Sequence, residues 1–214
     1  MNIHNTIIKR SALSDLFDGD AVDDSIGETK LSSRVVSSSF EKRKGVRVHR
    51  EANLRGIFPT SLDLKTVYLF MSTGDIDQLS YPTVIIEKFG VFDTFYCSTW
   101  TMTHLDVGVI ASWADSGLIR EPCFAVGEYF AKRETAAYAT LVAIISRTRG
   151  RVRCFANHAK IVLLGSAARD EWIVITGSSN LSMNPRSEQT TIFNDKEIYD
   201  FYRDWFESLF VGNK

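Results

Sequence analysis

The stretch NHAKIVLLGSAARDEWIVITGSSN, residues 157–180, carries two apolar runs on either side of a polar turn. The runs AKIVLL (159–164) and EWIVIT (171–176) contain many β-branched residues, which favour strands. We expect GSAARDE (165–171) to be the turn, with the two strands pairing antiparallel about its midpoint. The stretch therefore predicts a buried β-hairpin.

Four polar side chains lie at the open end of this hairpin. Successive side chains alternate faces along a strand, so His158 and Lys160 point the same way, as do Ser178 and Asn180. Pairing about the midpoint of the turn places residue 158 opposite 178 and residue 160 opposite 176, and opposed residues share a face. This register predicts that the four side chains form one cluster.

The predicted cluster has the chemistry of an anion site. Lysine gives a fixed positive charge, serine and asparagine give neutral hydrogen-bond donors, and a histidine that titrates near neutrality can attack or donate a proton. Phosphorus esters are the substrate class that these groups suit. The alternative is structural, with His158 an ordinary strand-end histidine and GSSN (177–180) an ordinary turn. The combination of both motifs argues against that alternative.

Strand and helix patterns alternate along the rest of the chain. Strand patterns lie at 66–71, 94–100, 123–130 and 151–156, and helix patterns lie at 103–117, 132–149 and 195–210. The helix ends carry cap or stop signals, namely Thr103, Gly117, Gly150 and either Asn194 or Asp195. This order of elements predicts an α/β sandwich around one mixed β-sheet flanked by helices.

The N-terminal part differs in composition from the rest. Residues 11–28 carry acidic side chains and no basic one, and the serine-rich SSRVVSSSF (32–40) follows. The basic stretch 41–55 is either a solvated connector or a segment that contacts a phosphate backbone. We expect residues 1–57 to be a polar, partly disordered arm and residues 58–214 to be the compact domain.

The overall composition limits the possible partners and the compartment. A formal net charge of −1 gives no global field toward polyanions, so a polyanion site has to be a local patch. The cysteines Cys97, Cys123 and Cys154 form no Cys-x-x-Cys pair, which fits a reducing compartment. No run approaches the roughly 20 apolar residues of a membrane span. We expect a soluble, cytoplasmic protein without stable membrane association, metal or cofactor.

The motifs HAK (158–160) and GSSN (177–180) resemble those of the phospholipase D superfamily. NPRSEQ (184–189) is similar to the continuation found in the small bacterial endonucleases of that superfamily, and the resemblance implies that Glu188 holds the ring of His158. It also implies a phospholipase D-like sandwich. The chain departs from the motif at Gly165, where the family usually has an aspartate.

The resemblance also implies a mechanism. Two His-x-Lys motifs share one site in that family, one histidine attacking phosphorus and the other protonating the leaving group. Because His4, His49 and His104 begin no second motif, we expect a homodimer with one composite site. In that site Lys160 would join Ser178 and Asn180, from both chains, in binding the substrate and stabilising charge on its oxygens.

Three functions remain open at this stage. The first is a metal-independent nuclease that cleaves DNA or RNA through a phosphohistidine. The second is a phospholipase D-type lipid hydrolase, and the third is a catalytically inactive nucleic-acid-binding protein of the same fold. Trp100, near the end of a predicted strand, either stacks on a base or packs in the core.

Overall fold

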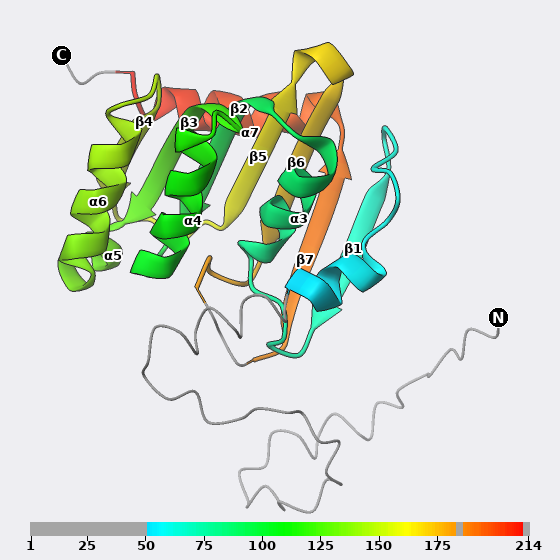
Figure 1. Cartoon of the computed structure of the whole chain (residues 1–214), viewed down its shortest axis with the longest axis horizontal. Helices are drawn as coiled ribbons and strands as arrows, with labels where there is room; N and C mark the ends of the chain where they lie inside the picture. The colour runs from blue at the N-terminus through cyan, green and yellow to red at the C-terminus, as the bar shows by residue number, and fades with distance from the viewer. Residues whose placement is uncertain (1–50, 183–185, 212–214) are drawn as a thin grey trace, which may run out of the picture. The chain divides into compact units, whose positions relative to one another are not determined.

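The computed structural model of the chain describes residues 51–182 and 186–211. These residues form a seven-stranded sheet in the order β1-β7-β6-β5-β2-β3-β4, flanked by helices (Figure 1). The strands are β1 (Val67–Ser72), β2 (Phe92–Thr99), β3 (Ile119–Gly127), β4 (Arg151–Phe155), β5 (Ile161–Ser166), β6 (Glu171–Gly177) and β7 (Glu188–Asn194). The helices are α3 (Ser80–Phe89), α4 (His104–Asp115), α5 (Glu128–Arg133), α6 (Thr135–Ile145) and α7 (Lys196–Ser208), and a short 3-10 turn, η1, spans Ala167–Arg169.

The sheet is mixed, as the sequence predicted. Strands β2, β3 and β4 pair in parallel because a helix joins each to the next, and every other pairing is antiparallel. It follows that β1, β2, β3, β4 and β6 end at the same edge of the sheet at which β5 and β7 begin. We call this edge the carboxyl edge, and it carries the candidate site.

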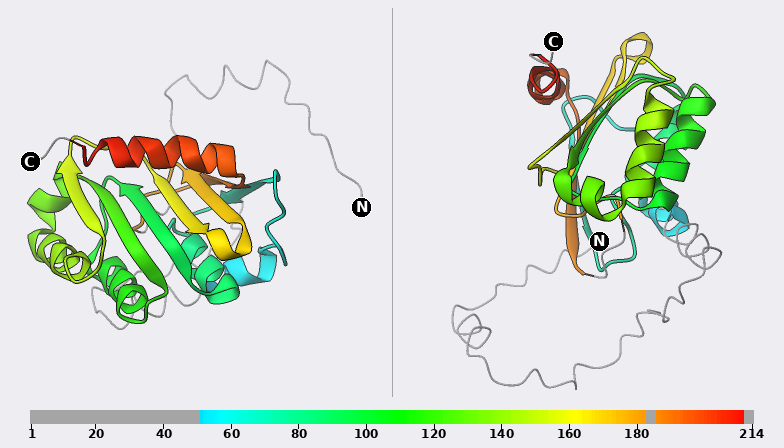
Figure 2. Two further views of the ribbon diagram at one scale, coloured as in Figure 1. Left: turned by 90° about the horizontal axis from the view of Figure 1, so that it is seen from above. Right: turned by 90° about the vertical axis from the view of Figure 1, so that its left-hand side faces the viewer.

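Each face of the sheet has its own apolar core. Helices α4 and α6 cover one face and α7 covers the other (Figure 2). The larger core joins the sheet to α3, α4 and α6 through residues such as Ile85, Ile110 and Leu141. The smaller core places Tyr199 and Phe206 of α7 against the opposite face. Burial on both faces confirms an α/β fold with helices flanking one mixed sheet.

Helix caps agree with several sequence signals. Thr103 and Asp106 form a capping box at the start of α4, in which the Thr103 side chain accepts from the Asp106 N–H. At α7 the cap is Asp195 and not Asn194, since Asp195 Oδ1 accepts from two backbone N–H groups at 2.8 and 3.0 Å. Both helices therefore begin where the sequence predicted.

Other boundaries differ from the prediction. The strand expected at 123–130 ends at Gly127, because α5 begins at Glu128. The helix expected at 132–149 is two helices, and the second ends at Ile145. Strand β7 and helix α3 were not predicted.

The segment just before the predicted domain boundary is helical. Residues 51–57 form a helical stretch in which Leu54 is fully buried in the larger core. Arg55 forms an ion pair with Glu87 of α3 at 2.7 Å. This part of the predicted arm therefore packs on the domain, while residues 1–50 lie outside the described residues. None of the described helices is long and apolar enough to cross a membrane.

Candidate active site at the carboxyl edge

The carboxyl edge brings the sequence-predicted residues to one end of the sheet. His158 and Lys160 lie in the connection between β4 and β5, directly before β5. Ser178 and Asn180 follow the last residue of β6, and Glu188 is the first residue of β7. Because β5, β6 and β7 are neighbours in the sheet, two connections, β4–β5 and β6–β7, come to the same edge here.

The pairing register within the hairpin was predicted wrongly by one residue. Ile161 pairs with Thr176, and the Gly177 N–H donates to Lys160 O at 3.4 Å, so residue 160 faces 177 and not 176. The reason is the turn, which begins after the Ser166–Glu171 pair and contains η1, so that its midpoint falls between two residues. His158 and Lys160 lie beyond the strand ladder, and the shifted register no longer places residue 158 opposite 178, so the predicted four-residue cluster stays a prediction.

The histidine and lysine contact each other directly. Lys160 Nζ lies 3.1 Å from His158 Nδ1 and donates to the His158 carbonyl oxygen at 2.9 Å. An ammonium group has donors only, so Nδ1 accepts and the proton of a neutral ring lies on Nε2. This contact was not predicted from the sequence, because the resemblance implied Glu188 as the partner of the His158 ring. His158 itself is exposed.

Ser178 joins the β6 end to the β7 start. Its hydroxyl donates to the Glu188 carboxylate and accepts from the Gln189 N–H at 3.1 Å, while its own N–H donates to the Gln189 carbonyl. Glu188 is buried, with 7% of its surface exposed. The Ser178 hydroxyl is thereby held beside a carboxylate.

The electrostatics of Lys160 reflect two opposing effects. Partial burial lowers the pKa of the ammonium group, and the nearby negative charge of Glu188 raises the pKa in part. The net direction is downward, so Lys160 loses its proton more easily than a lysine in water. Glu188 thus interacts electrostatically with Lys160 and also accepts a hydrogen bond from Ser178.

Two side-chain amides near this edge have unsatisfied atoms. Among the described residues, Asn180 Oδ1 and Gln78 Nε2 are buried without a hydrogen-bond partner. Gln78, just before α3, lies against Gly177, where a Cβ atom would stand 2.9 Å from Gln78 Oε1 and 2.7 Å from Gln189 O. The close approach explains the glycine of GSSN.

The loop that carries His158 is held by a buried amide that the sequence analysis missed. Asn157 Nδ2 donates to Ser98 Oγ and to Ala125 O, both at 2.9 Å, and Asn157 Oδ1 accepts from the Ala159 N–H at 3.0 Å. Ser98 Oγ in turn donates to Ala159 O at 3.0 Å. The only sequence signal was a polar residue directly before the His-x-Lys motif at the end of a strand.

The other histidines and the possible metal ligands contribute little to the candidate site. His104 is the first residue of α4, at the same edge, whereas His4 and His49 lie outside the described residues. No three histidine, cysteine, aspartate or glutamate side chains gather to hold a metal ion in the part of the chain that the structure describes. A site without metal remains a prediction.

Comparisons with known proteins give little support to a family assignment. No family model matches the chain, and no curated protein matches it. Among solved structures, the crystal structure of polyphosphate kinase from Porphyromonas gingivalis is 15% identical with a TM-score of 0.48, and the match covers 65% of this chain and 25% of that chain. The chain therefore spans about a quarter of that kinase's length.

This outcome corrects one prediction. The chain was identified by resemblance with the small endonuclease branch of the phospholipase D superfamily, but no family model supports the assignment, and a solved structure that it matches is entitled a polyphosphate kinase. That family assignment is wrong. What the site can do therefore has to be argued from its own residues.

Proposed function

We propose that the chain is a metal-independent phosphodiesterase that cleaves DNA or RNA through a phosphohistidine on His158. The observation that carries the proposal is the pairing of a histidine with a lysine at a sheet edge that also holds a serine, an amide and a carboxylate. Lys160 Nζ lies 3.1 Å from His158 Nδ1. A fixed positive charge beside a titratable ring suits an anionic phosphorus ester.

In the proposed first step, an unprotonated His158 Nε2 attacks phosphorus. The new N–P bond forms as the bond to the leaving oxygen breaks, and that oxygen takes a proton from a general acid. In the second step water attacks phosphorus, the N–P bond breaks, and the water proton returns to the acid. Lys160 and Asn180 stabilise the charge on the non-bridging oxygens, and Ser178 joins them when its hydroxyl turns from the Glu188 carboxylate to the substrate.

The two steps need one ring without a proton on Nε2 and one ring with it. The contact with Lys160 places the proton of a neutral ring on Nε2 in the protomer described here, so the attacking copy has to take the other tautomer and the acid copy has to be protonated on both nitrogens. One histidine cannot hold both forms at once. We therefore include in the proposal a homodimer with a twofold axis beside the motif, so that two copies of His158 lie on opposite sides of one phosphate.

The test is cleavage of labelled single- and double-stranded DNA and RNA in excess chelator. We expect cleavage to survive the chelator, to disappear in His158→Ala and to persist in His104→Ala, a matched histidine at the same edge of the sheet. Chelator-sensitive cleavage, or cleavage by pure His158→Ala, would overturn the proposal. If wild type cleaves none of these substrates, lipid phosphodiesters are the next substrates to test.

Subunit mixing tests the composite site separately. Wild type and His158→Ala are unfolded together in equal amounts and refolded, so that the dimers form at random. The activity of the mixture is compared with that of the same total amount of wild-type protein. If each site needs both histidines, about a quarter of that activity remains, and if one histidine suffices, about half or more remains. Sedimentation of the mixture checks that the dimers have formed.

A further inference from the structure

A column of planar groups leads away from His158 along the carboxyl edge. The Trp100 ring lies 5.5 Å from the His158 ring at an interplanar angle of 41°. Trp100 also stacks on Tyr129, with centroids 4.3 Å apart and an angle of 24°. The Arg133 guanidinium lies 5.9 Å from the Tyr129 ring centroid. We call Trp100, Tyr129 and Arg133 the ring column.

The ends of two neighbouring strands hold the ring column in place. Trp100 follows β2, and Tyr129 lies in the first turn of α5, directly after β3. At Gly127 a Cβ atom would stand 2.6 Å from Trp100 O and 2.9 Å from Trp100 Cδ1, so only glycine lets the indole lie against β3. Arg133 follows Tyr129 by four residues and therefore lies on the same side of α5.

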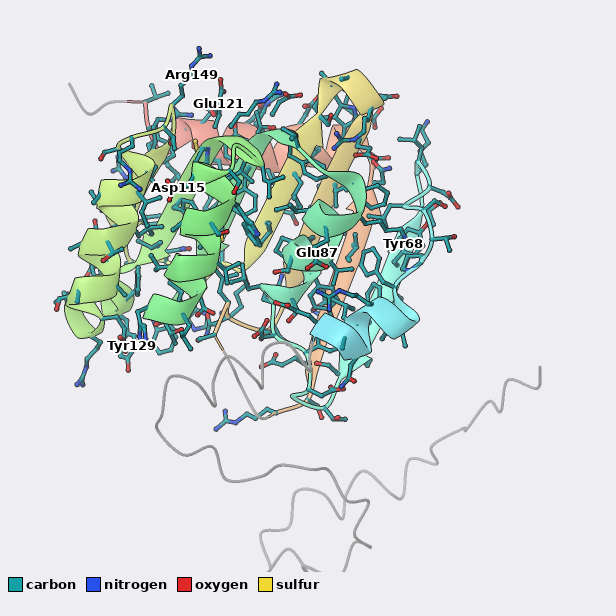
Figure 3. All side chains as sticks on the ribbon, viewed as in Figure 1. Tyr68, Glu87, Asp115, Glu121, Tyr129 and Arg149 are labelled. Atoms are coloured by element: carbon teal, nitrogen blue, oxygen red, sulfur yellow. The ribbon has the colours of Figure 1, made fainter. Side chains whose placement is uncertain are left out.

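Core packing does not explain these rings. Among the described residues, the two apolar cores include neither Trp100 nor Tyr129, whereas they include the buried Trp113. Tyr129 is 42% exposed, and Trp100 is only partly buried. Figure 3 shows Tyr129 at the lower left of the drawn side chains. Two stacked aromatic rings at the surface therefore lie next to the candidate nucleophile.

The charge at the end of the column is available to a ligand. Lys132 is paired with Glu128 at 2.8 Å, but none of the ion pairs among the described residues involves Arg133. Arg133 is exposed, and its guanidinium lies over the Tyr129 ring, so a base that stacks on this face of the ring has to displace it. A guanidinium group stacks on a flat ring and also pairs with a phosphate.

We propose that the ring column binds an unpaired nucleobase of the nucleotide next to the phosphate that His158 attacks. This inference rests on the proposed function and names its substrate as single-stranded nucleic acid, because a base inside a duplex cannot present its face to a side chain. Every base has a flat face, so the column would accept many sequences. The short distance from His158 places the bound base within one nucleotide of the reacting phosphorus.

The decisive experiment measures binding without turnover. In a His158→Ala background, the Kd for labelled oligothymidylate is compared with the Kd for an abasic oligomer of equal length. We expect Tyr129→Ala to weaken oligothymidylate binding about tenfold and to leave abasic binding unchanged. Tyr129→Phe keeps the ring and should bind as tightly as the background protein. Phe201→Ala removes an exposed aromatic ring of α7 and should change neither Kd.

Arg133→Ala tests the charge independently. We expect weaker binding of both oligomers and a salt dependence reduced by about one phosphate contact. An equal loss of oligothymidylate and abasic binding in Tyr129→Ala, or a duplex affinity that falls as much as the single-strand affinity, would overturn the base-binding column. These Kd values need no cleavage, so they test the ring column even if the nuclease proposal fails. If wild type cleaves nucleic acid but Tyr129→Ala leaves the Kd values unchanged, only the base-binding proposal is overturned.

Discussion

Gly165 of β5 lies so close to Tyr199 of α7 that a Cβ atom at residue 165 would stand 2.6 Å from the tyrosine oxygen. The same oxygen is hydrogen-bonded to Thr94 Oγ1 at 2.6 Å, and a Cβ atom would approach Thr94 even more closely. Residue 165 is thus a packing position beneath α7. It lies toward the hairpin tip, at the other end of β5 from Lys160.

We expect Gly165→Asp to destabilise the fold by about 3 kcal/mol or more, since it inserts a carboxylate where the Tyr199 and Thr94 hydroxyls already lie. Urea denaturation of purified protein measures the change. Gly108→Ala is the matched control, because a Cβ atom in that part of α4 meets nothing within 4 Å. It should stabilise the fold by about 0.5–1 kcal/mol. Wild-type stability of Gly165→Asp would contradict the packing role.

Asn157→Asp should damage both stability and turnover. The substitution keeps the shape but replaces the amide donor, which Ser98 Oγ and Ala125 O accept, by an oxygen. We expect a loss of about 2–3 kcal/mol in the free energy of unfolding, and a lower kcat at temperatures where the variant is folded, because the loop bearing His158 is released. Ala156→Ser, at the exposed neighbouring position, is the control and should change neither. Full activity in folded Asn157→Asp would remove its positioning role.

The alkaline side of the pH–rate profile should report Lys160. Burial lowers the pKa of this lysine, so its ammonium group is lost, and kcat/KM falls, at a lower pH than for a lysine in water. Glu188→Gln removes a charge that raises this pKa, and the alkaline fall should move to still lower pH. Lys160→Arg keeps its charge throughout, so its residual activity should not fall in that range. An unmoved profile in Glu188→Gln would contradict the coupling.

The hydrogen bonds that Glu207 of α7 accepts from Arg151 and Tyr96 should weaken in acid. Burial raises the pKa of Glu207, but hydrogen bonds from Arg151 (2.6 Å) and Tyr96 (2.7 Å) outweigh it, so the pKa is lowered in the folded protein. The stabilisation from these bonds is therefore present above the unfolded-state pKa, near 4.3, and is lost as the pH falls through the folded-state value. Glu207→Gln should be less stable at neutral pH and lose less stability on acidification. Parallel curves of Tm against pH for both proteins would contradict this.

Local patterns explain what the sequence could predict. Helix α7 follows from its apolar stripe and from the capping residue Asp195, and β5 and β6 follow from two β-branched runs around a turn. Helix α3 was missed because its run PTVII is short and β-branched and because Pro82 stands near its start. Strand β7 was missed because residues 184–189 were interpreted only as part of the motif.

The site depended on contacts that no local pattern contains. Its motif residues were predicted, and they lie at one edge of the sheet. The Asn157–Ser98 hydrogen bond joins residues 59 positions apart, and the stack of Trp100 on Tyr129 joins the ends of two strands. Such contacts depend on strand order, and parallel neighbours are separated by whole helices in the sequence. Even the pairing register of the hairpin could be predicted correctly only with the structure of its turn.

The length of β5 has a practical consequence. The tip of the β5–β6 hairpin, residues 167–170, lies at the opposite end of six-residue β5 from Lys160, about 20 Å away. The candidate catalytic side chains lie beyond the ladder, and the backbone of Ile161 and Thr176 sets their position. The tip is therefore a suitable place to attach a fluorophore or insert a short peptide tag, which would report on the molecule without touching the chemistry.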